Sequence, residues 1–267
     1  MTYEPKTDSN APVLVERIGH VTILKLNRPK ALNAINAELA TALGGYLEEL
    51  NDDVEQRVGI ITGSGKAFSA GMDLKAFAAG ESVEPAGHPE WGFGGVVNHF
   101  INKPLIAAVN GYAFGGGAEI ALACDLIVAD ETSSWGFPEV TRGLFAGAGG
   151  LTRLAQQIPQ RLAMEMLLTG EPVSAARAAE CHLVNKLAPQ GDALKVALEL
   201  AQTIAENAPL AVQASKRLLH NTRHSDPWAA GTWEATRAEM DGVFGSADAK
   251  EGATAFAEKR EPAWTGH

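Results

Sequence analysis

The sequence is poor in cysteine, in aromatic residues and in positive charge, and each shortage bears on the class of protein. Its two cysteines, Cys124 and Cys181, stand far apart and form no CxxC pair, so we expect neither a zinc ribbon nor a disulfide framework. This sparse use of cysteine suits a reducing cytoplasm, where we expect the protein to reside. Acidic side chains outnumber basic ones by 32 to 22, and the resulting net charge of -10 argues against nucleic acid as the main partner.

The sequence also lacks an apolar run near its start and an uninterrupted run of membrane length. The opening segment MTYEPKTDSNAP is polar and predicts a frayed tail, not a signal peptide. The most apolar stretch, residues 105–129, is interrupted by Asn110, by three successive glycines, by Glu119 and by Asp125. We therefore expect this stretch to be buried core and expect no membrane association.

Hydrophobic residues make up 46% of the 267 positions and charged residues 20%, the mixture of a folded soluble protein with a sizeable core. Short apolar runs rich in β-branched residues alternate with patterns of helical period, so the expected fold class is α/β. The predicted strands are 21–27, 58–63, 105–111, 125–130 and 183–188, and the predicted helices between them are 36–52 and 119–124.

After about residue 190 only helical patterns remain, at 192–207, at 209–221, and from Pro227 and Asp248. We expect a core over residues 1–200 and a helical region over 201–267 whose apolar faces invite docking onto a neighbouring subunit. The segment 78–95 carries prolines and glycines without apolar periodicity, which predicts a loop that is either a lid or an ordinary surface excursion.

Two glycine-containing segments are candidates for binding an anion or an oxyanion. GGGAE, residues 115–119, follows a buried strand and opens a helix, so the unpaired N–H groups of the first helical turn point outward. In AFSAGMDLKAF, residues 67–77, the N–H of Met72 is a second exposed donor. Taken alone, each segment favours a plainer interpretation: a tight turn in the first, and a strand-to-helix connection capped by Asp73 in the second.

Glu119 and Glu139 are candidates for an acid and base pair. Each lies beside apolar and glycine-rich sequence, where a purely solvating glutamate is not expected, and burial would raise its pKa into the range that proton transfer needs. The chain holds 32 acidic residues, however, so most pairs chosen at random are only surface charge.

Several motifs, in order along the chain, resemble those of the enoyl-CoA hydratase/isomerase, or crotonase, family. They are NRPKALNAI from Asn27, AFSAGMDLK from Ala67, and three longer runs over 103–129, 137–154 and 255–266. The resemblance covers nearly the whole chain and implies a spiral of repeated ββα units followed by C-terminal helices that build homotrimers, often paired as hexamers. AGMDLKAFAAGE, GYAFGGG and AFAEKREPAW are also similar to carnitinyl-CoA dehydratases.

The resemblance implies roles for individual residues. The N–H groups of Met72 and Gly116 would form the oxyanion hole for the thioester carbonyl, with Glu119 as the base that activates water and Glu139 as the acid that protonates the α-carbon. It implies no separate cofactor and no metal, because coenzyme A is part of the substrate. The implied substrate contacts, the last two possibly from a neighbouring subunit, are Lys30, Ala31, Leu32, Ala70, Asp73, Leu74, Lys75, Phe256 and Lys259.

Alternative functions stay open at this point. The resemblance favours reversible syn addition of water to a trans-2-enoyl-CoA in fatty acid or related metabolism, and dehydration of a polar 3-hydroxyacyl-CoA is the same chemistry. Double-bond isomerisation commonly needs only the acid that Glu139 matches, and a binding-only protein would be favoured by loss of a glutamate, yet both are present. His220 and His224 have a possible metal spacing but no third ligand nearby, so surface histidines are favoured. For Arg260 and Glu261 a solvated charged face is expected.

Overall fold

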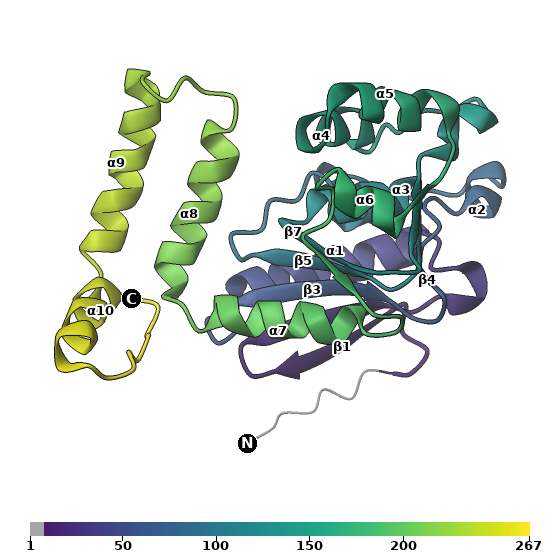
Figure 1. The fold of residues 1–267 in the computed structure, drawn as a ribbon. Coiled ribbons are helices and arrows are strands. Elements are labelled where there is room, and N and C mark those ends of the chain that lie inside the picture. The colour runs from purple at the N-terminus through teal and green to yellow at the C-terminus, as the bar shows by residue number, and fades with distance from the viewer. Residues whose placement is uncertain (1–7) are drawn as a thin grey trace.

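The computed structural model describes residues 8–267 and contains two β-sheets surrounded by helices (Figure 1). The first seven residues of the polar opening segment lie outside the described residues. The larger sheet has the strand order β1-β2-β3-β5-β7-β10, antiparallel between β1 and β2 and parallel elsewhere. Its strands are β1 Val13–Ile18, β2 Val21–Leu26, β3 Val58–Gly63, β5 Leu105–Val109, β7 Leu126–Asp130 and β10 Lys186–Ala188.

The smaller sheet has the order β4-β6-β8-β9 and is built from very short strands. These are β4 Ala67–Ser69, β6 Tyr112–Phe114, β8 Ser134–Gly136 and β9 Val173–Ser174. Successive pairs, β3 with β4, β5 with β6 and β7 with β8, each give one strand to the large sheet and the next to the small one. A helix or helical turn follows each pair, so the chain is a spiral of repeated ββα units.

Side chains along each strand of the large sheet point alternately to its two faces, so the hydrophobic core has two layers, one on each face. Ile60, Ile106 and Val128 face helix α7, Ala193–Ala205, which meets the sheet through Ala197 and Ala201. Because alanine is small, this helix packs closely on the sheet. The opposite face carries Leu24, Ile61 and Ala107 toward helix α1, Ala37–Asp52, and helix α3, Gly116–Ala123. Because helices cover both faces of the sheet, its central strands consist almost entirely of apolar residues, and the sequence therefore predicts them.

Helix α1 confirms its predicted bounds and orientation. Leu39, Leu43, Leu47 and Leu50 are 0–1% exposed on its inner face, and the Asn36 side chain caps its start by accepting from Leu39 N–H. The remaining segments before residue 190 are α2 Leu74–Ala78, α4 Gly150–Gln157, α5 Gln160–Thr169 and α6 Ala175–Glu180, with the 3-10 turns η1 Pro29–Ala31, η2 Pro89–Trp91, η3 Phe93–Gly95 and η4 Pro138–Arg142.

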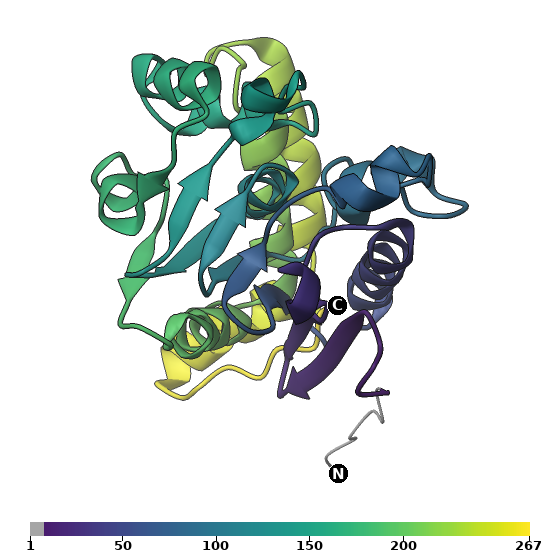
Figure 2. The ribbon, with the colours of Figure 1, turned by 90° about the vertical axis from the view of Figure 1, so that its right-hand side faces the viewer.

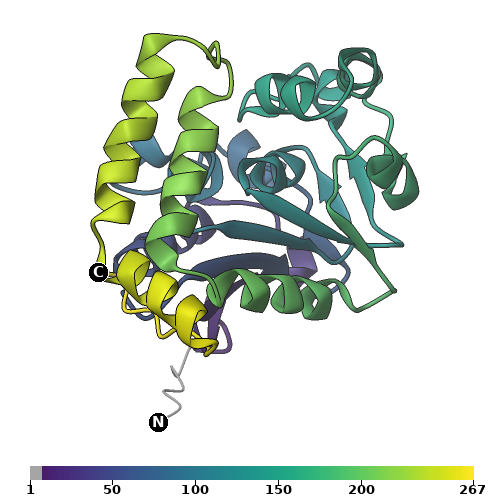
Figure 3. The same cartoon turned by 60° about the vertical axis from the view of Figure 1, so that its left-hand side comes forward.

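The C-terminal region is helical after α7, as the sequence predicts. Helices α8, Pro209–Thr222, and α9, Ala230–Phe244, run side by side and project from the sheets, and α10, Ala247–Glu258, lies at their lower end (Figures 1 and 3). Figure 2 shows this helical pair behind the sheets, on the side away from α2. Among residues 8–267 no helix is both long and apolar enough to cross a membrane.

Candidate active site

The glycine-rich start of α3 forms one wall of the candidate site. Gly115 has a φ of +53° and caps the helix, which leaves Gly116 as the first helical residue. The amide N–H groups of a first helical turn have no partner inside the helix, so the Gly116 N–H is available to a ligand. A Cβ atom on Gly116 would lie 2.2 Å from Cε1 of Phe93, so only glycine fits between this ring and the helix.

Met72 lies beside this helix start. It pairs with Ile35 in an isolated parallel bridge that uses the C=O of Gly71, accepting from Ile35, and the N–H of Asp73. In such a bridge the N–H of Met72 itself points to the opposite side. Gly71 has a φ of +86°, and a Cβ there would be 2.8 Å from the Gly116 nitrogen. The two backbone segments predicted to polarise a carbonyl are therefore neighbours.

Glu119 is one helical turn after Gly116 and is only 3% exposed. Its Oε1 accepts a hydrogen bond of 2.8 Å from the backbone N–H of Gly150, at the start of α4. Burial raises the pKa of Glu119 to about 7, and the charge of Glu139 adds to the rise, while hydrogen bonds from the backbone of Gly150 and Ala148 oppose it. A carboxyl group of this kind can exchange a proton near neutral pH.

Glu139 lies in η4, after β8, and reaches the same place from the other side. Its Oε1 lies 3.0 Å from where a Cβ on Gly115 would be, and the Gly115 N–H donates to the C=O of Gly136 at 2.9 Å. Burial also raises the pKa of Glu139. Its Oε2 is buried and has no hydrogen-bond partner among residues 8–267, an arrangement that suits a group whose partner is a substrate or a water molecule.

The second half of the segment 78–95 packs against this site, a feature that the sequence did not reveal. Trp91 stacks between His88 and His99, with ring centroids 3.8 and 4.6 Å apart, and covers Gly44 of α1. Phe93 follows and contacts Gly116. The glycines around Phe93 permit this close packing, because a Cβ on Gly95 would lie 2.4 Å from the C=O of Ala40. Residues 81–90 are mostly exposed, and whether they close over the site stays a prediction.

The predicted substrate-binding residues near η1 and α2 lie close to one another. Lys30 and Ala31 belong to η1, Leu32 follows with a left-handed φ of 53°, and the Ala70 N–H donates to the C=O of Leu32 at 2.9 Å. Buried Asn33 supports this arrangement, because its amide donates to the C=O groups of Ser64 and Ala67.

Asp73, Leu74 and Lys75 form the start of α2. Leu74 and Lys75 are exposed. The Asp73 side chain caps the helix, accepting from the N–H groups of Lys75 and Ala76, and pairs with Arg28 at 3.0 Å. Although partial burial opposes it, these bonds hold the pKa of Asp73 below its usual value. The plainer interpretation of Asp73 as a cap is therefore confirmed.

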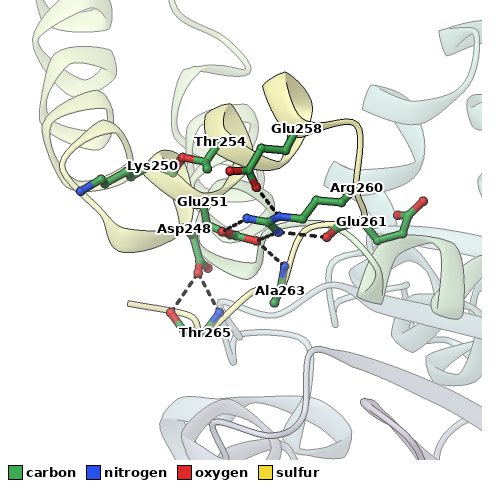
Figure 4. Close-up of polar contacts among 9 residues, drawn as sticks. All are labelled: Asp248, Lys250, Glu251, Thr254, Glu258, Arg260, Glu261, Ala263 and Thr265. Carbon is green, nitrogen blue, oxygen red and sulfur yellow. Dashed lines mark hydrogen bonds and ion pairs between the residues drawn. The ribbon is translucent and has the colours of Figure 1, made fainter.

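Helix α10, which carries Phe256 and ends at Lys259, lies at the opposite end of the molecule from α2 (Figure 1), so a single chain does not bring all the predicted residues together. Phe256 is 88% exposed on α10, and Lys259 ends that helix with a φ of +56°. Figure 4 shows that Arg260, in the segment after α10, forms ion pairs with Glu251 and Glu258 of that helix.

The chain after α10 folds back and fixes its position. Buried Asp248 accepts from the N–H groups of Thr265 and Gly266, and Trp264 Nε1 donates to the C=O of Glu206 at 2.7 Å. Arg260 and Glu261 are exposed, as expected of a solvated charged face, and Arg260 is in addition bonded to Glu251 and Glu258.

His220 and His224 form no metal site, and residues 8–267 hold no group of three candidate ligands close enough for a metal ion. His220 instead pairs with Asp125 at 2.9 Å, and Lys216 contacts the same carboxylate at 2.7 Å. These contacts attach α8 to the end of α3 and the start of β7. His220 therefore has a structural partner that the sequence did not indicate.

Comparison with known proteins identifies the family of the chain. The family described as enoyl-CoA hydratase/isomerase matches residues 16–267. A carnitinyl-CoA dehydratase of Salmonella typhimurium is 42% identical over 254 residues, which cover 94% of this chain and 97% of the relative.

Two solved structures are similar over nearly their whole length. The enoyl-CoA hydratase of Mycobacterium tuberculosis H37Rv has a TM-score of 0.91 at 48% identity, covering 97% of this chain and 100% of that one. A carnitinyl-CoA hydratase of Mycobacterium avium has a TM-score of 0.78 at 49% identity, with the same coverage. The chain therefore belongs to the enoyl-CoA hydratase/isomerase, or crotonase, family.

Proposed function

We propose that this protein catalyses the reversible syn addition of water to a trans-2-enoyl-CoA thioester. The observation that carries the proposal is the meeting of two carboxyl groups, that of the buried Glu119 and that of the half-buried Glu139, beside the backbone N–H groups of Met72 and Gly116. The two N–H groups polarise the thioester carbonyl and stabilise the negative charge that develops on its oxygen, with the dipole of α3 adding to the effect. The β-carbon thereby becomes electrophilic.

The environments of the two glutamates suggest their roles. Glu119 accepts the Gly150 N–H, which favours its ionised form, so we assign it as the base that takes a proton from the attacking water. The buried Oε2 of Glu139 has no hydrogen-bond partner among residues 8–267, and burial raises the pKa of Glu139 although its own backbone N–H and Arg142 oppose the rise, so Glu139 is assigned as the acid that protonates the α-carbon. In the reverse direction, elimination of water, the two residues exchange roles.

We also propose that the complete site forms in a homotrimer, or in a hexamer of two trimers. Coenzyme A would lie against Lys30, Ala31 and the start of α2, and the exposed Phe256 and Lys259 would reach the site of a neighbouring subunit. In this arrangement residues 1–200 supply the chemistry and 201–267 the association. Light scattering on the purified protein tests the oligomer, and a monomer would contradict it.

Dehydration of a polar 3-hydroxyacyl-CoA such as carnitinyl-CoA is the second candidate. It is favoured by the 42% identity to carnitinyl-CoA dehydratases over 94% of the chain. The chemistry at Glu119 and Glu139 is the same, so the difference between the two candidates lies in the acyl group. Segment 78–95 is the part of the site where this choice would be made.

Loss of the conjugated enoyl-thioester absorbance tests the proposal with crotonyl-CoA and with a longer enoyl-CoA. Glu119→Gln and Glu139→Gln should both remove activity, and Glu165→Gln, which changes an exposed carboxylate of α5, should not. If the absorbance stays constant, appearance of the same absorbance from carnitinyl-CoA tests the second candidate. Thioester binding without turnover of any of these substrates would contradict both.

A further inference from the structure

Arg153 lies behind Glu119, in the first turn of α4. Its N–H donates to the C=O of Gly149 at 2.8 Å, and its Nη2 donates to the C=O of Val97, in the segment that follows η3. Its Nη1 lies where a side chain on Gly149 would be, 2.0 Å from the ideal Cβ position. The guanidinium group therefore packs against the backbone turn at Gly149 and helps to fix its conformation.

The same turn contains the N–H group that donates a hydrogen bond to Glu119. Gly149 has a φ of +105°, and the next residue, Gly150, donates its N–H to Oε1 of Glu119 at 2.8 Å. A Cβ on Gly150 would be 3.0 Å from that oxygen, so carboxylate and backbone are in close contact. Arg153 therefore contacts the backbone that Glu119 binds, and it is the positively charged side chain that acts on this carboxyl group.

The other charged groups around this pair are few. Glu119 faces Glu139 from η4, whose own neighbouring charge is Arg142. Arg153 faces the Cys124 thiol, directly after α3, and Arg223, directly after α8. Burial lowers the pKa of Arg153, and Glu119 opposes this change. A guanidinium group nonetheless keeps its charge at every pH at which the enzyme would work. Arg153 is therefore a fixed positive charge beside a carboxyl group that titrates.

We infer that Arg153 is a positioning residue whose fixed charge keeps Glu119 ionised as the base, and that the contacts of its guanidinium group with the Gly149–Gly150 turn and with Val97 hold this charge in place. The inference rests on the proposed function for its catalytic meaning. The effect of charge can be separated from that of packing, since lysine keeps the charge at residue 153 but lacks the fork that fills the space at Gly149, whereas glutamine lacks both.

The test is the pH dependence of kcat/KM for crotonyl-CoA hydration in Arg153→Gln, Arg153→Lys and wild-type protein. Loss of a nearby opposite charge raises a carboxyl pKa, so the acidic limb of Arg153→Gln should move upward by about 0.5 to 1 pH unit. Activity should then fall about 3- to 10-fold on the acidic side of the profile and approach the wild-type value at high pH, with KM unchanged. Arg153→Lys should keep the acidic limb near its wild-type position.

Arg161→Gln, an exposed arginine of the adjacent helix α5, is the matched control and should leave the profile unchanged. An unshifted limb in Arg153→Gln would overturn the inference, and so would an equal shift in Arg153→Lys, which would assign the effect to packing.

A second readout does not depend on turnover. The infrared band of the protonated Glu119 carboxyl, assigned by its loss in Glu119→Gln, should persist to higher pH in Arg153→Gln than in wild type. If wild type hydrates none of the thioesters but the band shifts, the proposed function fails and the effect of Arg153 on Glu119 stands. If wild type is active and neither limb nor band shifts, only the inference fails.

Discussion

Replacing Glu119 by glutamine should make the protein more stable at alkaline pH while removing its activity. In the folded protein the pKa of Glu119 is raised to about 7, mainly by burial, from a usual value of 4.5. The folded state therefore holds this proton more tightly than the unfolded state does. Below pH 4.5 Glu119 is protonated in both the folded and the unfolded state, so its ionisation does not change the free energy of unfolding. As the pH rises from 4.5 toward 7, the unfolded state ionises more readily and the free energy of unfolding decreases. Above pH 7 the full cost of burying the charge is present.

The magnitude follows from the size of the shift. Each pKa unit corresponds to about 1.4 kcal/mol, so ionised Glu119 destabilises the folded state by about 3 kcal/mol at pH 8. Glutamine has nearly the same shape, can still accept the Gly150 N–H through its amide oxygen, and carries no charge. The stability advantage of Glu119→Gln over wild type should therefore grow by roughly 2 to 3 kcal/mol between pH 5 and pH 8.

Urea unfolding followed by the fluorescence of the five tryptophans measures this difference, at one protein concentration because subunit association adds to stability. Glu165→Gln on the exposed side of α5 is the control and should show no such growth. An advantage of Glu119→Gln that is equal at pH 5 and pH 8 would refute the reasoning, because it would mean that the carboxyl group titrates alike in the folded and unfolded states.

Three further changes probe the packing around the site. Gly116→Ala should reduce kcat by about 10²- to 10³-fold, because the added Cβ would lie 2.2 Å from the Phe93 ring and would displace the N–H donor. Adding Phe93→Ala to this variant removes the clash and should restore part of the rate. Trp91→Ala removes the stack with two histidines and should lower the free energy of unfolding by about 2 kcal/mol, measured in urea, whereas an unchanged value would mean that the stack contributes nothing. Asp248→Ala leaves two backbone N–H groups without their acceptor and should cost about 2 kcal/mol, and limited proteolysis should cut the segment after α10 sooner than in wild type.

The strands of the large sheet were predictable because burial on both faces makes their sequences continuously apolar. The prediction at 58–63 matches β3 residue for residue. The run at 183–188 shows the limit of this signal, since only Lys186–Ala188 is a strand, while Leu183 and Val184 are buried without strand structure. Apolar sequence reports burial, and burial does not require an extended backbone. Strands of two or three residues, such as β4 and β9, are too short to show any period.

The site was predictable in its parts but not in its assembly. Local sequence indicated free N–H groups at the start of the glycine-rich helix and at Met72, whereas the approach of Glu139 to Gly115 depends on a contact between residues 24 positions apart. The resemblance to a family, and no local pattern, pointed to that pairing.

Glycine-rich sequence also has two meanings. Around Phe93 it predicts a loop, yet Gly92, Gly94 and Gly95 have positive φ in a segment that packs the Trp91 ring against Gly44 of α1 and the Phe93 ring against Gly116 of α3. The sequence alone does not distinguish a glycine that makes a loop flexible from a glycine that allows neighbouring groups to pack closely.

One turn of α3 carries both the Gly116 donor and the Glu119 carboxyl group. In the proposed mechanism, the part that polarises a carbonyl and the part that moves a proton thus belong to one rigid helical turn, whose internal distances no surrounding loop can change. The mostly exposed residues 81–90 lie outside this turn. Reaction chemistry and acyl preference can therefore vary separately, and variant libraries confined to those exposed positions could seek new acyl groups while the reacting geometry is inherited unchanged.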